Sequence, residues 1–155
     1  MKVFNEFVLR NGGSIVNFSV DEEEAYKREW FEKVVPPDKR ELAEKCHCFN
    51  RNDEYGVIHG FLWHVFSYKI LDCLVGEKAK NSFNNTVKKD AVLLVGFTQT
   101  DVETSRLRDI SFLTADVLDS LADVIITDSG FKWTYVKTHE KQCGPYYHYI
   151  RTVET

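Results

Sequence analysis

The sequence predicts an α+β protein, a single layered domain over residues 1–155 with a mixed β-sheet flanked by helices. Three stretches predict core strands, because β-branched and aromatic residues dominate them between turn-forming residues: Val57–Phe66, Ala91–Phe97 and Lys132–Thr138. Strand-like and helix-like segments alternate along the chain, without an internal repeat or a linker long enough to divide it. These observations favour one core built from both kinds of element.

The first third of the chain predicts a strand followed by two helices. Ser14–Ser19 follows a Gly-Gly turn and has the apolar content of a short strand. Asp21 is the expected N-cap of the next helix, because three glutamates follow it and acids favour the positive end of the helix dipole. Pro36-Pro37 ends this helix, and a second short helix is expected over roughly Asp38–Lys45.

The middle of the chain predicts two strands separated by a helix. The run Val57–Phe66 favours a largely buried strand, although a helix over Val57–Tyr68 fits the same residues, because short apolar runs do not separate the two by period. Glu77–Asn84 predicts a helix, and Ala91–Phe97 is the clearest central strand. The polar residues Gln99–Arg108 predict a loop or an exposed ribbon.

The last third predicts short elements joined by tight turns. Ser111–Leu113 is expected to form a short strand, and Thr114 to cap a helix over Ala115–Ala122. Val124–Thr127 predicts a strand, which an Asp-Ser-Gly turn connects to the last expected strand, Lys132–Thr138.

Composition and charge restrict the class of protein. A chain of 155 residues with 43% hydrophobic and 28% charged residues is long enough to bury a core without disulfides or metals. The net charge of −4, with no run of Lys and Arg, argues against a nucleic-acid or membrane-surface partner.

The N-terminus and the cysteines together indicate a cytoplasmic protein. No stretch has the features of a signal peptide, and none approaches the roughly 18 consecutive apolar residues of a membrane span. The four cysteines are therefore expected to remain thiols in a reducing compartment.

Two groups of histidine and cysteine have both a metal-binding and a structural interpretation. The triplet Cys46-His47-Cys48 offers zinc ligands, with His59, His64, His139 and Cys143 as candidate partners, but no zinc-finger spacing is present. The alternative is two small buried thiols beside an exposed histidine. His59 and His64 would face opposite sides of a strand, so they are not expected to share one site.

The densest group of reactive residues is His139, Glu140 and Cys143. A cysteine nucleophile needs a base, and His139 can reach Cys143 if the chain turns there, with Glu140 orienting the imidazole. We expect His64 to lie near the same edge of the sheet. The alternative is that these side chains tie down the loop while two tyrosines dock on the core. The segment lacks the second histidine of HExxH, and GxxxxGK[ST], GxGxxG and GxSxG are absent, so no cofactor is expected.

Two segments resemble the motifs of a bacterial family of short proteins described as a domain of unknown function. Gly60–Tyr68 is similar to an LWHxFSY motif, and Trp133–Tyr146 to WTYVxTHE…CGPYF, with Phe83-Asn84 matching a shorter element between them. Tyr147 stands where the family more often has Phe. The resemblance implies no activity, but it singles out Trp63, His64, Ser67, Tyr68, Trp133, Thr138, His139, Glu140, Cys143 and Tyr146.

Two classes of function remain. The first is a small cytosolic protein-binding protein, of the immunity or antitoxin kind, whose acid-rich stretch Asp101–Asp123 attracts a basic partner. The second is a small Cys/His-dependent enzyme with a site around His139 and Cys143. The sequence leaves the substrate, the identity of the partner and the oligomeric state open.

Overall fold

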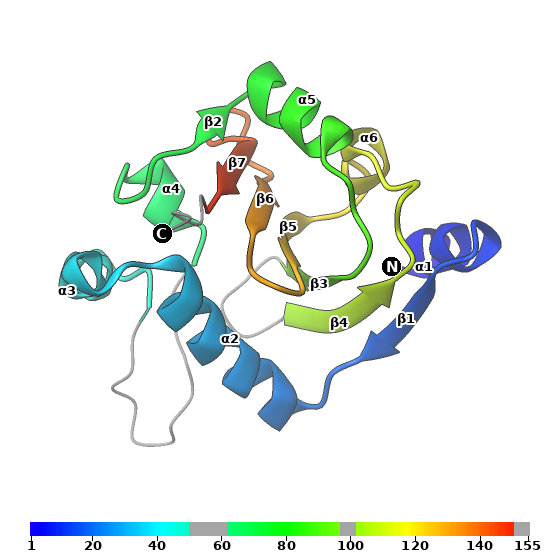
Figure 1. Ribbon diagram of the computed structural model, residues 1–155, viewed down its shortest axis with the longest axis horizontal. Coiled ribbons are helices and arrows are strands. Elements are labelled where there is room, and N and C mark those ends of the chain that lie inside the picture. The colour runs from blue at the N-terminus through cyan, green and yellow to red at the C-terminus, as the bar shows by residue number, and fades with distance from the viewer. Residues whose placement is uncertain (50–61, 97–101, 151–155) are drawn as a thin grey trace, which may run out of the picture.

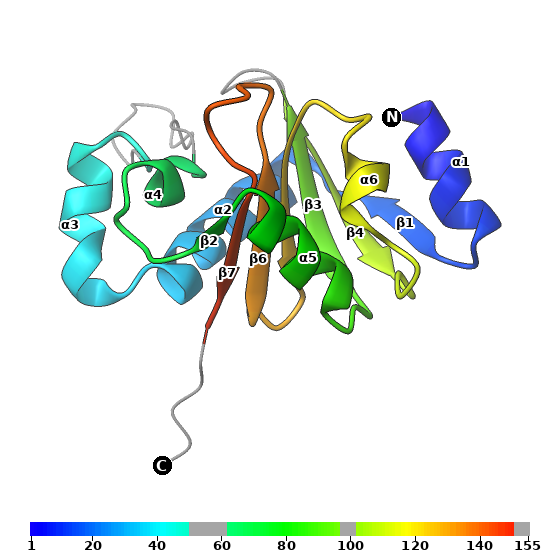
Figure 2. The same cartoon turned by 90° about the horizontal axis from the view of Figure 1, so that it is seen from above.

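The computed structural model describes residues 1–49, 62–96 and 102–150, in which helices cover both faces of an antiparallel sheet (Figures 1 and 2). The helices are α1 Lys2–Arg10, α2 Val20–Val34, α3 Pro37–Lys45, α4 His64–Ser67, α5 Glu77–Asn85 and α6 Ala115–Leu118. The strands are β1 Ser14–Asn17, β2 Leu74–Val75, β3 Ala91–Gly96, β4 Val102–Arg108, β5 Asp123–Asp128, β6 Trp133–Lys137 and β7 Tyr146–Tyr149.

The α+β class is confirmed, but the strand directions differ from the mixed sheet that we expected. Within the described ranges the sheet has seven strands in the order β1-β4-β3-β5-β6-β7-β2, and every pair is antiparallel. Tight connections explain much of this, since a turn such as Asp128–Phe131 between β5 and β6 can only reverse the chain.

The central strand is the one that the sequence marked most clearly. Strand β3 lies between β4 and β5, and residues Ala91–Val95 are buried, as their unbroken apolar character requires. The predicted strands over Val124–Thr127 and Lys132–Thr138 are also confirmed, as β5 and β6, and they extend the sheet on one side of β3. Phe97, which was included in the predicted strand, lies outside the described residues.

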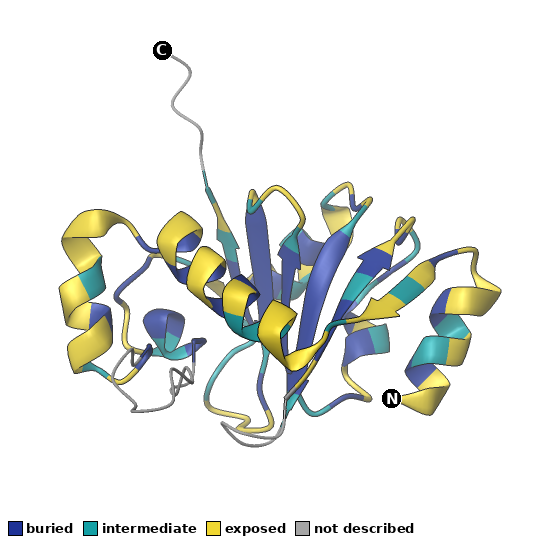
Figure 3. Ribbon diagram, turned by 90° about the horizontal axis from the view of Figure 1, so that it is seen from below, coloured by how far each residue is buried: buried dark blue, intermediate teal, exposed yellow. Residues whose placement is uncertain are grey.

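Each face of the sheet has its own apolar core (Figure 3). On one face the rings of α2 and α4, including Trp30 and Phe66, pack on β3, β5, β6 and β7. On the other face α1, α5 and α6 cover the sheet, and Phe83 stacks on Tyr135 with a centroid separation of 4.4 Å. Trp63 and Trp133 are buried, as expected for large rings in a core, with 6% and 3% of their surfaces exposed.

The N-cap of helix α2 lies two residues earlier than the acid-rich run suggested. Ser19, and not Asp21, is the N-cap: its hydroxyl accepts the Glu22 backbone N–H at 3.2 Å, and the Glu22 carboxylate accepts the Ser19 N–H at 3.1 Å. This reciprocal pair is a capping box, whose Ser-x-x-Glu spacing is present in the sequence. The helix ends before Pro36, and α3 begins at Pro37, close to the predicted boundary.

The strand predicted over Val57–Phe66 is wrong where it can be compared, since residues 57–61 lie outside the described residues. From Leu62 onward the chain forms a turn and then helix α4, which starts at His64. Leu62, Val65 and Phe66 are all buried, and their spacing of three and four residues is helical. The alternative helical interpretation of this run therefore fits its last residues.

Other elements differ from the expectations in length or kind. Helix α1 and the strands β2 and β7 were not predicted. The polar segment Gln99–Arg108 contains strand β4 from Val102, and the shortened helix α6 ends at Leu118. Ser111–Leu113 forms a turn and not a strand. None of the helices in the described ranges is long and apolar enough to cross a bilayer.

Candidate functional site

The loop that joins β6 to β7 holds three of the predicted site residues, and it is closed by its own hydrogen bonds. Thr138, which is buried, directs its hydroxyl at the carbonyl oxygens of Glu140, at 3.1 Å, and of Cys143. The Cys143 N–H donates to the Glu140 carbonyl at 2.9 Å. The backbone of this loop, residues 138–143, is therefore fixed from within, and we call it the β6–β7 loop.

The end of the loop is fastened to its neighbours by Gly144 and Pro145, which are joined by a cis peptide bond. Gly144 has a φ of +99°, and a Cβ there would lie 3.3 Å from the ring of Tyr146, so this position requires glycine. The Pro145 carbonyl accepts the Gly76 N–H at 2.9 Å. The loop is thus held against β2 and the Tyr146 ring.

His139 is oriented by Asp123, a residue that the sequence did not single out for this role. The Asp123 Oδ1 accepts the His139 backbone N–H at 2.6 Å and lies 2.8 Å from His139 Nδ1. The acceptor is a carboxylate, so Nδ1 carries the hydrogen. The Asp123 side chain is 11% exposed and that of His139 is 55% exposed. The orienting function that we assigned to Glu140 therefore belongs to Asp123, at the start of β5.

The side chains of Glu140 and Tyr146 both influence the ionisation of the Cys143 thiol. The Cys143 S–H donates to the Glu140 carboxylate, an arrangement that favours the protonated thiol. The Tyr146 hydroxyl donates to the Cys143 sulfur, which favours the thiolate and disfavours ionisation of the phenol. Cys143 thus lies between a donor and an acceptor. We call Tyr146, Cys143, Glu140 and His64 the thiol cluster.

The fourth member of this cluster, His64, comes from the other family motif, Gly60–Tyr68. Its Nδ1 lies 2.8 Å from the Ser67 hydroxyl, one helical turn later, and its ring stacks on Tyr68 with centroids 4.6 Å apart and planes inclined by 6°. The Glu140 carboxylate acts electrostatically on the imidazole. The two motifs are far apart in the sequence, but the fold brings them close enough for the Glu140 charge to raise the pKa of His64, against the larger effect of burial.

The electrostatics of the cluster define its protonation at neutral pH. The hydrogen bond to Glu140, followed by partial burial, raises the pKa of the Cys143 thiol. Burial raises the pKa of Tyr146 to about 12. Burial also raises the pKa of Cys73, which acts electrostatically on Tyr146, to about 11. Burial lowers the pKa of His64 despite the opposing effect of Glu140. At neutral pH the cluster therefore contains a neutral thiol, a neutral phenol and a neutral imidazole.

The structure divides the four predicted residues between two arrangements. His64, Glu140 and Cys143 come together in the thiol cluster, whereas the Nδ1 of His139 is directed at Asp123. Asp123 was missed because its pairing with the loop depends on how β5 and β6 are aligned, with Val124 opposite Lys137. Tyr146 was available from the motif, but its contact with the thiol depends on the turn at Gly144.

The triplet Cys46-His47-Cys48 lies at the end of α3. Cys48 is fully buried and burial raises the pKa of its thiol to about 12, while Cys46 is half-buried and His47 is exposed. The Cys48 thiol donates to the Cys46 carbonyl at 3.9 Å. All four cysteines are free thiols, and the described part of the chain contains no group of three or more residues placed to hold a metal ion. His59 lies outside the described residues.

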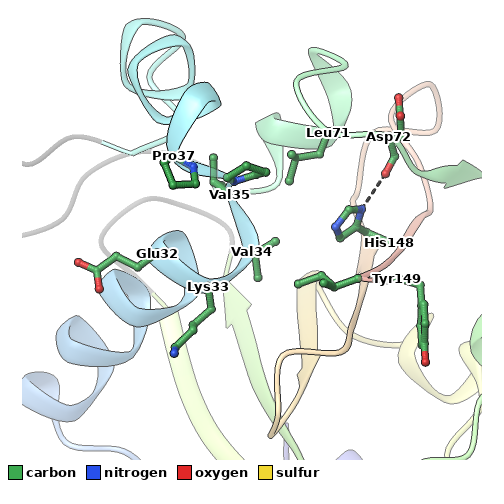
Figure 4. Close-up of a pocket in the computed structure, with 11 residues that line it drawn as sticks. Glu32, Lys33, Val34, Val35, Pro37, Leu71, Asp72, His148 and Tyr149 are labelled. Atoms are coloured by element: carbon green, nitrogen blue, oxygen red, sulfur yellow. Dashed lines mark hydrogen bonds between the residues drawn. The ribbon is translucent and has the colours of Figure 1, made fainter. Parts of the chain in front are cut away.

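A groove lies beside the thiol cluster, between the end of α2 and strand β7 (Figure 4). Its volume is about 610 Å³, and His148 extends into it from β7, with Nδ1 2.7 Å from the Asp72 carbonyl oxygen. The ring of Phe66 lies 5.6 Å from His148 and 6.2 Å from Tyr146, so it separates the groove from the cluster. No motif or pattern in the sequence singled out His148.

These features define a small α+β protein with a hydrogen-bonded thiol cluster at one end of an antiparallel sheet. The chain belongs to the family described as a domain of unknown function, DUF4275, whose family model matches residues 4–147. The match extends into the N-terminal third of the chain, beyond the segment that the motifs covered. Neither the curated proteins nor the solved structures contain a significant match to the chain.

Proposed function

We propose that the chain is a small protein-binding protein of the immunity or antitoxin kind, which acts in the bacterial cytoplasm on a basic partner. The observation that carries this proposal is the acid-rich exposed face of α2. Its exposed charged residues are four acids, Asp21, Glu22, Glu29 and Glu32, and two bases, Arg28 and Lys33. A surface of this sign accelerates association with a positively charged protein and disfavours acidic ones.

The acids of Asp101–Asp123 form a less continuous surface. Asp123 is engaged by His139, and Asp119 lies 3.8 Å from the ammonium of Lys80. The remaining described acids of this stretch are distributed over β4, the turn after it and α6. Helical spacing, in contrast, aligns the acids of α2 on one side, opposite Trp30 and the core. Figure 3 shows that much of α2 is exposed. We therefore assign the main partner surface to α2.

A charge-reversal experiment tests this proposal. The tagged protein is used to capture partners from a lysate of its native host, at low and at high salt. Glu29→Lys with Glu32→Lys should reduce recovery of a basic partner at least tenfold, because the face changes sign, and raised salt should have the same effect on the parent. Glu41→Lys with Glu44→Lys, on the exposed side of α3, is the matched control and should bind normally.

Two results would contradict the binding proposal. One is a partner whose recovery ignores both salt and the reversal on α2. The other is equal loss of recovery in the α2 and α3 variants, which would show a dependence on net charge and not on a particular face. With a purified partner, the association rate and not the dissociation rate should carry most of the salt dependence.

The thiol cluster supports a second candidate, a small thiol-dependent enzyme. Here Cys143 would be the nucleophile and Glu140, which already accepts its S–H, would remove the proton on attack. His64, on which the Glu140 charge acts and whose imidazole is neutral because burial lowers its pKa, would be the second proton acceptor. The raised thiol pKa requires such a base, because little thiolate exists at rest.

Thiol trapping separates this candidate from the binding proposal. The native protein is treated with a chloroacetamide at neutral pH, and modification of each cysteine is followed by mass spectrometry. The enzyme candidate predicts that Cys143 reacts before the half-buried Cys46 and that His64→Gln, which removes the second proton acceptor, slows the reaction of Cys143. Faster reaction at Cys46 would reject it. Cys143→Ser should leave partner capture unchanged if binding depends on α2 alone.

A further inference from the structure

The groove between α2 and β7 has apolar walls and one polar group directed into it. Pro36, Pro37 and Ile150 supply its accessible apolar surface, and the side chains of Val34, Val35 and Leu71 lie buried behind it. His148 stands opposite them on β7 (Figure 4). A volume of about 610 Å³ is within the range of small-molecule sites, roughly 300–1,000 Å³.

The hydrogen bond of His148 determines what its ring offers to the groove. A carbonyl oxygen only accepts, so the 2.7 Å contact with the Asp72 carbonyl places the hydrogen on Nδ1. In the neutral ring the other nitrogen, Nε2, then has a lone pair and no hydrogen. Nε2 is at the distal edge of an imidazole that extends from β7 into the groove, so the groove contains a hydrogen-bond acceptor.

The charged residues around the groove do not add a formal charge to its interior. The side chains of Glu32 and Lys33 extend away from the imidazole, and the carboxylate of Asp72 points outward from its backbone contact with His148 (Figure 4). A charged ligand would therefore lose hydration without gaining a partner of opposite sign. A neutral ligand with an apolar body fits these walls.

We propose that this groove binds a neutral, mainly apolar small molecule that carries one hydroxyl group. The apolar body contacts Pro36, Pro37 and Ile150, and the hydroxyl donates its hydrogen to Nε2 of His148. The Asp72 carbonyl fixes both the orientation of the ring and the position of its hydrogen, so the acceptor is prepared before the ligand arrives. The site adjoins the acidic face of α2, with which it shares Glu32 and Lys33, and the ring of Phe66 separates it from the thiol cluster.

A pair of matched probes tests the hydroxyl requirement. 4-Propylphenol and 4-propylanisole share one apolar body, but the methyl ether lacks the O–H donor. Binding is followed by two-dimensional amide NMR of the full chain. The parent protein should bind the phenol about fivefold more tightly than the ether, the effect of about 1 kcal/mol for one net hydrogen bond. The largest shifts should fall on residues 34–35, 71–72 and 148–149.

His148→Phe provides the second arm of the experiment. Phenylalanine keeps the aromatic volume and the contact with Phe66 but has no acceptor, so the two probes should bind this variant equally. Equal affinity for both probes in the parent would overturn the proposal, and this measurement needs no variant. Shifts scattered over other parts of the molecule, or no saturable shift with either probe, would also overturn it.

Discussion

Replacing Thr127 with valine should destabilise the protein by removing a polar connection from its core. The indole N–H of Trp30 donates to the Thr127 Oγ1 at 2.9 Å, and this oxygen lies 3.0 Å from that of Thr134. The three side chains are almost completely buried, at 0%, 0% and 1% exposure. An indole nitrogen can only donate, so Thr127 is the acceptor that links α2 to the middle of the sheet.

The size of the effect follows from the groups that lose a partner. Valine has almost the same shape as threonine, so packing is retained while the Trp30 N–H is left without its acceptor. A buried polar group without a partner costs about 1–3 kcal/mol, and the Thr134 hydroxyl loses a contact as well. We therefore expect the free energy of unfolding to fall by roughly 2 kcal/mol, and the melting temperature to fall by about 4–8 °C for a chain of this size.

Urea denaturation of four proteins measures this contribution. Thr127→Val, Trp30→Phe and the double variant form a double-mutant cycle with the parent. Phenylalanine removes the donor, so Thr127→Val should cost about 1 kcal/mol less in that background. Thr114→Val is the control, because the Thr114 side chain makes no capping hydrogen bond, and it should change stability by less than about 0.5 kcal/mol. A strictly additive cycle, or a Thr127→Val variant as stable as the parent, would refute the reasoning.

Three further predictions concern the helix cap and the thiol cluster. Ser19→Ala should reduce stability by about 1 kcal/mol in urea denaturation, because both hydrogen bonds of the capping box are disturbed; an unchanged midpoint would contradict the capping function. Glu140→Gln should increase the alkylation rate of Cys143 near pH 8, since removing the carboxylate lowers the thiol pKa; a slower reaction would reverse the assigned sign. Burial lowers the pKa of His64, so its folded state binds a proton less readily than the unfolded chain, and this contribution to stability is present above the unfolded pKa of about 6.5 and is lost as pH falls. His64→Gln should therefore show a smaller loss of stability between pH 7 and pH 5 than the parent.

Elements with an unambiguous local pattern could be predicted from the sequence. Ala91–Gly96 is apolar at every position except its last, which only a strand or helix buried on both sides accommodates, and its length and β-branched residues favour the strand. Glu77–Asn85 has its buried residues, Ala79 and Phe83, at a spacing of four. In these segments local preference and tertiary packing agree.

The errors occur where tertiary contacts determine the structure. Strand β7 is rich in tyrosine and follows a Gly-Pro turn, but its pairing with β6 and β2 gives it a place in the sheet that no local signal indicates. The run that ends at Phe66 is apolar enough for a strand, yet its last residues form a helical turn that the His64–Ser67 hydrogen bond stabilises. Short apolar runs are ambiguous for this reason.

Only part of the candidate site could be predicted, because the rest of it also depends on tertiary contacts. Motif positions identified His64, Glu140 and Cys143, which lie together, because reactive side chains beside a Gly-Pro turn are visible in the sequence. Which acid orients His139 is decided by the alignment of β5 with β6, and this alignment is a property of the whole sheet. His148 had no signal of its own, since its role comes from a groove formed by α2, the Leu71-Asp72 segment and β7.

The order of strands in the sheet has a consequence for how the chain acquires its structure. Strands β3 to β7 follow one another in the sequence and pair among themselves. Strands β1 and β2, in contrast, pair with strands that come much later in the chain. Closing such long segments costs more entropy and is slower. The segment Lys2–Lys45 emerges from the ribosome before the strand that it needs, because β4 begins only at Val102. We therefore expect this segment to remain without its partners during most of translation, and to dock on a centre that forms from the C-terminal half.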